Sequence, residues 1–180
     1  MRIALIGGSL RLESVSARVL HTCARLVSAR GAIPTVLTAA DLALPLYEPG
    51  VTARTPQACK LIETLRSADG IVLATPTYHG GMSGLMKNVL DYTEDLAADS
   101  YLDGRAAGCV AVGWSEHGAA TAIADLRNSV QSLRAWATPM GVTINSAAMD
   151  EFDARTTRRL DIMLGQVLDF AALRTSALVS

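Results

Sequence analysis

Three hydroxyl side chains and one arginine lie in a short loop behind the first apolar segment of the chain. That segment, residues 2–7, is almost continuously apolar, as a strand covered on both faces should be. The residues that follow it are Ser9, Arg11, Ser14 and Ser16. Hydroxyls, backbone N–H groups at a helix N-terminus and a guanidinium together favour a phosphate ligand. The alternative is that Ser14 or Ser16 only caps the helix and that Arg11 is a solvated surface charge.

A second loop, residues 76–81, combines a rigid proline with flexible glycines and ends at a new helix. Such a loop can lay backbone N–H groups and a flat aromatic edge beside a heterocycle, which suits an isoalloxazine ring. Donors beside that ring stabilise the charge that develops when it is reduced. The loop, which contains Pro76, Thr77, Tyr78, His79 and Gly80, could therefore lie beside a flavin, with Tyr78 in contact with the ring.

Two side chains of this second loop have other interpretations. His79 could be a general acid, and Tyr78 could be a core aromatic. A flavin accepts hydride at N5 without a protein base, which favours a binding or steric role for His79. We therefore expect no catalytic side chain, because the flavin carries the chemistry.

A third loop, residues 113–118, follows another apolar run. Its small residues Gly113, Ser115 and Gly118 let a ligand approach the backbone closely. Trp114 in the same loop either stacks on the flavin or a substrate, or serves in packing or in a subunit contact.

Strand-like and helical segments alternate along the chain and position these loops. The expected strands are residues 2–7, 34–37, 71–75, 105–113 and 138–146, each followed by an amphipathic helical pattern. Parallel strands need crossover connections of one preferred hand, so the pattern predicts a doubly wound α/β sheet with helices on both faces. Ligands bind such sheets at the carboxyl ends of the strands, where the three loops are expected.

Composition excludes several classes of protein. A chain of 180 residues that is 50% hydrophobic predicts one domain, expected over residues 1–173, with residues 174–180 as a frayed tail. The 16 basic and 17 acidic residues offer no excess positive field for nucleic acid or an anionic membrane. No apolar run reaches the length of a membrane span, and no signal peptide is visible, so we expect a cytoplasmic location.

Cysteines and histidines give no sign of a metal site. Cys23, Cys59 and Cys109 are odd in number and widely spaced, which favours reduced core thiols. His21, His79 and His117 lack the spacing of metal ligands, so we expect no metal.

Two motifs resemble those of the NAD(P)H-dependent FMN reductase family. The first is Gly7-Gly8-Ser9-Leu10-Arg11-x-x-Ser14-x-Ser16, and the second is Thr75-Pro76-Thr77-Tyr78-x-Gly80-x-x-x-Gly84-x-x-Lys87-Asn88-x-Leu90-Asp91. The resemblance covers the chain to about residue 173. It implies a flavodoxin-like sheet of five parallel strands in the order 2-1-3-4-5, with FMN bound at the three loops and NAD(P)H as co-substrate. Thr77 and His79 replace the glutamate and asparagine of many members, as in monooxygenase-associated flavin reductases.

The same resemblance implies roles for individual residues. Ser9, Arg11, Ser14 and Ser16 would hold the FMN phosphate, Pro76, Thr77, Tyr78 and His79 would border the ring, and Gly113, Ser115 and Gly118 would lie at its far edge. Lys87, Asn88 and Asp91 would tie the second loop to its helix and to a neighbouring subunit of a homodimer or homotetramer.

The implied reaction is ping-pong: a reduced nicotinamide gives hydride to flavin N5 and departs, and a second acceptor takes its place. Free flavin, supplied to a monooxygenase, is the favoured acceptor. The alternatives are a quinone, azo or chromate reductase with bound FMN, a flavodoxin-type electron carrier and a flavin-binding regulatory protein. A net charge of −1 and the arginine-rich stretch at residues 155–159 argue against the acidic docking surface of a flavodoxin.

Overall fold

The structure is a computed structural model that describes residues 1–148 and 152–177. Its strands are β1 (Arg2–Gly7), β2 (Ile33–Leu37), β3 (Gly70–Tyr78), β4 (Gly81–Met82), β5 (Ala106–Gly113), β6 (Trp136–Ala137) and β7 (Val142–Asn145). Its α-helices are α1 (Val15–Ala29), α2 (Pro56–Arg66), α3 (Gly84–Asp91), α4 (Glu116–Ser132) and α5 (Ala154–Ala177). Short 3₁₀ helices are η1 (Ala39–Leu42), η2 (Tyr92–Asp99) and η3 (Ser146–Ala148).

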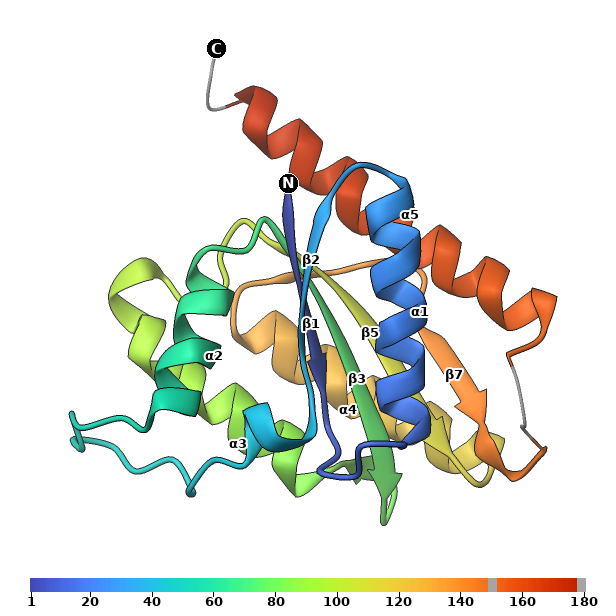
Figure 1. The fold of residues 1–180 in the computed structure, drawn as a ribbon, viewed down its shortest axis with the longest axis horizontal. Helices are drawn as coiled ribbons and strands as arrows, with labels where there is room; N and C mark the ends of the chain where they lie inside the picture. Colours follow the sequence, from blue (N-terminus) through green and yellow to red (C-terminus); the bar gives the residue numbers. More distant parts are fainter. Residues whose placement is uncertain (149–151, 178–180) are drawn as a thin grey trace.

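The strands form one twisted sheet between two helical layers (Figure 1). Its order is β2-β1-β3-β5-β6, with β7 also paired to β5, and these pairings are parallel. Helices α1 and α5 pack on one face, and α2, α3 and α4 pack on the other. The doubly wound, flavodoxin-like class is confirmed. None of the helices in the described ranges is long and apolar enough to cross a membrane.

Hydroxyl side chains set where four helices begin. Ser14, Thr55, Ser83 and Ser115 are the N-caps of α1, α2, α3 and α4, and each accepts a hydrogen bond from a backbone N–H in the first turn. Such a bond satisfies one of the N–H groups that lack an acceptor within the helix. Helices α3 and α4 therefore begin within three residues of the strands that precede them.

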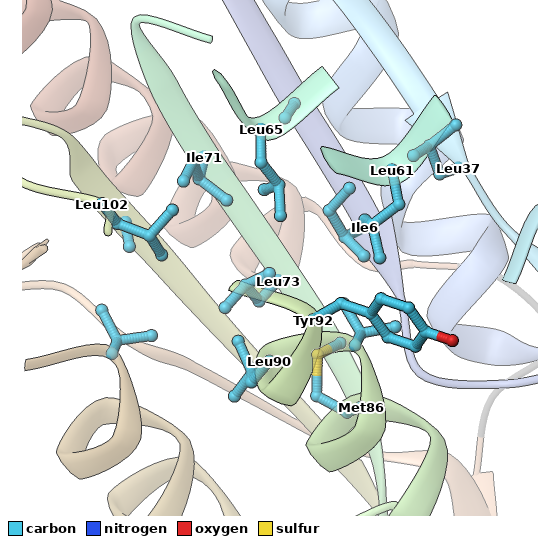
Figure 2. Close-up of a cluster of buried hydrophobic side chains, with 14 of the residues drawn as sticks. Ile6, Leu37, Leu61, Leu65, Ile71, Leu73, Met86, Leu90, Tyr92 and Leu102 are labelled. Carbon is cyan, nitrogen blue, oxygen red and sulfur yellow. The ribbon is translucent and has the colours of Figure 1, made fainter. Parts of the chain in front are cut away.

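Buried strands supply alternate side chains to two cores. From β1, Ile3 and Leu5 face α1 and α5, whereas Ala4 and Ile6 face α2 and α3. Figure 2 shows the second core, where Met86, Leu90 and Tyr92 pack beneath β1 and β3. Because both faces of the sheet are covered, the central strands β1 and β5 are buried almost throughout and nearly continuously apolar.

The sheet has seven strands instead of the expected five. Of the expected strand 138–146, only residues 142–145 form a strand, β7, which pairs with the end of β5, and residues 136–137 before it form β6, which pairs with the start of β5. Between the pairs Ala137–Ala107 and Val142–Val110, this edge contains two residues more than β5. Pro139 has no N–H to donate, and the N–H of Met140 turns away to Gln166 of α5 (2.8 Å). The additional strand β4 is a short antiparallel partner of β3.

Two of the three cysteines are buried, as expected. Cys23 and Cys109 are buried free thiols, and burial raises the pKa of each to about 12. Cys59 is also free but exposed on α2, so the expectation of a core position is wrong for it.

Helix α5 extends to Ala177, within the expected tail, and residues 178–180 of that tail lie outside the described residues.

Candidate functional site

A small pocket opens at the carboxyl ends of β1, β3 and β5. Its volume is about 190 Å³, and it brings all three predicted loops together. The predicted residues that line it are Ser9, Arg11, Ser14, Ser16, Pro76, Thr77, Tyr78 and Gly113. Glu13, Val15, Val112, Trp114 and Ser146 also line it. His79 and Gly80 in the turn after β3, and Ser115 and Gly118 at the start of α4, are not part of this lining.

The first loop carries its hydroxyls at the N-terminus of α1. Ser14 Oγ caps the helix by accepting from the N–H of Ala17 (3.1 Å), and it lies 3.1 Å from Ser16 Oγ. Ser9 Oγ accepts from the N–H of Arg11 (3.2 Å). Capping and phosphate binding are compatible here, because a hydroxyl that accepts from the helix can still donate its proton to a phosphate oxygen. The helix N-terminus adds a favourable electrostatic field for an anion.

A buried serine ties the first loop to the second. Ser83 Oγ donates to the carbonyl of Gly8 (2.7 Å) and caps α3 by accepting from the N–H of Met86 (3.0 Å). The N–H of Ser83 in turn donates to Thr75 Oγ1 (3.0 Å). A Cβ on Gly8 would lie 2.9 Å from Ser83 Oγ and 3.1 Å from Thr75 Cα, so only glycine permits this approach. Sequence reasoning missed the link, although Ser83 was visible as a helix start.

The second loop is a tight hairpin, since β3 continues to Tyr78 and pairs with β4. His79 and Gly80 form its two-residue turn, with φ of +50° and +82°. Two consecutive positive φ values define the turn type that matches the twist of a hairpin. Asp125 of α4 supports this hairpin by accepting from the N–H of Met82 (3.0 Å). His79 thus has a backbone role, and its exposed side chain lies outside the pocket lining.

Thr77 has a buried hydroxyl for which the described residues offer no hydrogen-bond partner. An ideal Cβ on Gly113 would lie 3.1 Å from Thr77 Oγ1, and one on Gly118 would lie 3.4 Å from Thr77 Cγ2. The two glycines of the third loop therefore make room for Thr77. An unpaired buried hydroxyl is unfavourable unless a ligand satisfies it. This orphaned donor in the pocket lining fits a flavin ring, which presents carbonyl oxygens and ring nitrogens along its edge.

The third loop is shorter than expected, because α4 begins at Glu116. Ser115 Oγ accepts from the N–H of Gly118 (3.1 Å), so both residues form the start of that helix. Ser146, which sequence reasoning missed, donates from Oγ to the carbonyl of Gly113 (3.2 Å) and fixes the end of β5.

The structure shows other contacts for Lys87, Asn88 and Asp91, which we expected to tie the second loop to its helix. Asn88 accepts from the N–H of Tyr47 (2.8 Å) and donates to the carbonyl of Pro45 (2.9 Å). It therefore ties the connection after η1 to α3, whereas we expected it to hold the second loop. Lys87 and Asp91 form an exposed ion pair one helical turn apart.

Comparisons with known proteins agree with this geometry. Residues 1–149 match the family described as NADPH-dependent FMN reductase. The NAD(P)H-dependent FMN reductase PA1204 of Pseudomonas aeruginosa is 28% identical over 160 residues, which are 86% of this chain and 83% of that protein. An NADPH azoreductase of Bacillus sp. (strain OY1-2) is 35% identical over 103 residues, or 57% of this chain. Those residues span little more than half of the azoreductase, 56% of its length.

A solved structure shows the same fold. The flavoenzyme NAD(P)H:(acceptor) oxidoreductase FerB of Paracoccus denitrificans superposes with a TM-score of 0.73 and 21% identity, over 95% of each chain. The expected family is confirmed, and its description names FMN, the expected cofactor. The chain belongs to the NADPH-dependent FMN reductase family, a family of flavin-dependent oxidoreductases.

Proposed function

We propose that this protein oxidises NAD(P)H through FMN bound in the pocket and passes the electrons to free flavin, which then serves a monooxygenase. The proposal rests on one observation: a group of side chains that suits a phosphate and a group that suits a ring line the same pocket. A hydroxyl-rich helix N-terminus with Arg11 lies on one side, and the unpaired hydroxyl of Thr77 lies on the other. The first suits a phosphate monoester, and the second suits the polar edge of a ring.

The side chains of the first loop bind the FMN phosphate in this proposal. Ser9, Ser14 and Ser16 donate hydroxyl protons to its oxygens, and Arg11 contributes a charge-assisted hydrogen bond. Thr77 Oγ1 donates to the ring edge. FMN, when bound, supplies the redox chemistry, because its ring accepts a hydride at N5 and returns two electrons to an acceptor. Each turnover consumes one NAD(P)H and one solvent proton for each acceptor reduced by two electrons.

The outer side of the pocket leaves room for two substrates in turn. The side chains of Tyr78 and Trp114 are 59% and 83% exposed, so the site opens directly to solvent. A reduced nicotinamide can enter, transfer hydride, and leave before the acceptor arrives. No acid–base pair is required for this exchange, which agrees with the backbone role of His79 in the hairpin turn.

A quinone, azo or chromate reductase with permanently bound FMN is the second candidate. The likeness to the azoreductase favours it, although only over 57% of this chain. An electron carrier of the flavodoxin type is less favoured, because the net charge is only −1. As further proposals, we place the protein in the cytoplasm and expect a homodimer or homotetramer, which sedimentation would measure.

Turnover with a panel of acceptors tests the proposal. The FMN-loaded protein is mixed with NADPH or NADH, and the loss of nicotinamide absorbance is followed with free FMN, a quinone or an azo dye as acceptor. We expect saturable oxidation with free FMN, and transfer of reduced flavin to an added flavin-dependent monooxygenase. Turnover confined to quinones or azo dyes, with FMN never released, would support the second candidate. No oxidation with any acceptor would refute both.

A further inference from the structure

Trp114 is the most exposed aromatic side chain at the pocket. It is the first residue after β5, it lines the pocket, and its side chain is 83% exposed. The adjacent Gly113 is buried and held by Ser146, so the backbone that carries the indole is fixed. The other tryptophan, Trp136, lies at the opposite end of β5 and packs against Phe170, with ring centroids 5.7 Å apart.

The exposed indole does little for the stability of the fold. A tryptophan buries 150–250 Å² when it packs in a core, and nearly all of that gain is absent at an exposure of 83%. No described aromatic ring or cation is found in contact with the Trp114 ring. A large exposed apolar side chain on a fixed backbone beside a ligand pocket is typical of a contact to a partner that binds and dissociates.

Other exposed apolar side chains belong to the loops that form the pocket. Tyr78 is 59% exposed at the end of β3, and Leu10 and Leu12 are 58% and 73% exposed in the first loop. Residues 9, 11 and 13, which alternate with these leucines, line the pocket. The pocket thus combines polar lining residues, which suit FMN, with exposed apolar side chains on the three loops that form it.

We propose that Trp114 selects the electron acceptor by stacking on it, and that acceptors with a flat aromatic ring are therefore preferred over compact inorganic ones. The inference rests on the proposed function. It adds which residue contacts the second substrate and what shape that substrate has. A flat ring that lies over the bound flavin has one face toward it and one toward solvent. The indole at the rim can cover that outer face, and such aromatic pairs have favourable offset or edge-to-face geometries.

The kinetic test separates the two half-reactions in a stopped-flow instrument. The variants are Trp114→Ala and Trp114→Phe, with Trp136→Ala as the matched control at the far end of the sheet. Reoxidation of the reduced protein is measured with menadione, which is flat, and with ferricyanide, which is octahedral. We expect Trp114→Ala to lower the second-order rate for menadione about three- to tenfold, the range that aromatic contacts give. We expect Trp114→Phe to keep the rate for menadione within about twofold of the wild-type rate, and both variants to leave the rate for ferricyanide unchanged.

Binding provides a readout that does not depend on activity. The chain has two tryptophans, so labelling with 5-fluorotryptophan gives two fluorine resonances that Trp136→Phe assigns. Menadione is added to the oxidised, FMN-loaded protein without nicotinamide. We expect the resonance of Trp114 to shift and that of Trp136 to stay. A Trp114 resonance that does not move would overturn the inference.

The remaining outcomes keep the inference distinct from the proposed function. Equal losses with menadione and ferricyanide, or an FMN dissociation constant raised more than tenfold by Trp114→Ala, would overturn acceptor stacking while the reductase activity stands. Conversion of an oligomer to a monomer by Trp114→Ala would also overturn it and make Trp114 a subunit contact. Absence of NAD(P)H oxidation by the wild type would refute the proposed function, and the fluorine shift would still decide whether the indole binds flat rings.

Discussion

Substitution of Thr77 by valine should stabilise the protein without ligand and weaken its binding of FMN. Thr77 Oγ1 is buried and unpaired among the described residues, and burying an unpaired hydroxyl costs about 1–3 kcal/mol. Valine has nearly the same volume and is also β-branched, so it fits the end of β3 without a new cavity. We therefore expect the free energy of unfolding of the FMN-free protein to rise by roughly 1–2 kcal/mol. The lost hydrogen bond to the ring should raise the FMN dissociation constant about two- to tenfold.

Thr75, two residues earlier on the same strand, is the matched control. Its hydroxyl donates to the carbonyl of Pro76 (2.9 Å) and accepts from the N–H of Ser83 (3.0 Å), and the residue is fully buried. Thr75→Val should therefore destabilise the protein by about 1–3 kcal/mol. Urea denaturation of both FMN-free variants and quenching of FMN fluorescence measure the two quantities. A loss of stability in Thr77→Val, or an unchanged FMN affinity, would show that this hydroxyl has a partner other than the flavin.

Three further predictions address the phosphate loop, the hairpin and a distant ion pair. Arg11→Ala should weaken FMN binding by about 1–3 kcal/mol, as a titration would show, and an unchanged affinity removes Arg11 from the site. His79→Asn should keep both stability and turnover, whereas His79→Val should lose about 1–2 kcal/mol of stability because valine disfavours a φ of +50°; lost turnover in His79→Asn would instead indicate acid catalysis. Hydrogen bonding to Arg54 lowers the pKa of Asp95 from its usual 3.8, so this ion pair stabilises the fold fully above that pH. The difference in unfolding free energy between wild type and Asp95→Asn should therefore shrink as the pH falls below 3.8. If the difference stays constant down to pH 2, the charge of Asp95 does not contribute to stability through Arg54.

Local chemistry made part of the fold predictable from the sequence. The start of α1 is visible in the sequence, because a serine cap precedes apolar residues at helical spacing. The start of α2 is visible as well, because Thr55 is its cap and Pro56 its first residue. The loops behind β1, β3 and β5 could also be placed in advance, because parallel strands end at one edge of the sheet. Each of these predictions needs only neighbours in the sequence or the general rules of α/β topology.

The features that were missed depend on residues far apart in the chain. The hydrogen bond from Ser83 to the carbonyl of Gly8 joins positions 75 residues apart, and no periodicity indicates it. Asp125 supports the hairpin from a helix 43 residues later, and its sequence neighbourhood is that of an ordinary surface helix. The last expected strand begins only at Val142, because Pro139 has no N–H to donate and the N–H of Met140 is bonded to Gln166, a residue of a helix 26 positions later.

These long-range hydrogen bonds hold the floor of the pocket but not the exposed side chains at its mouth. Gly8, Ser83 and Thr75 join the first two loops, and Ser146 fixes the third through the carbonyl of Gly113, so hydrogen bonds hold the backbone of each loop that forms the floor. The exposed side chains at the mouth, Trp114 above all, stand outside this network and can change rotamer without disturbing it. A rigid floor suits a cofactor that binds in one orientation throughout turnover. An adaptable apolar rim suits the two substrates that must use the same opening in turn, because it can repack around each of them.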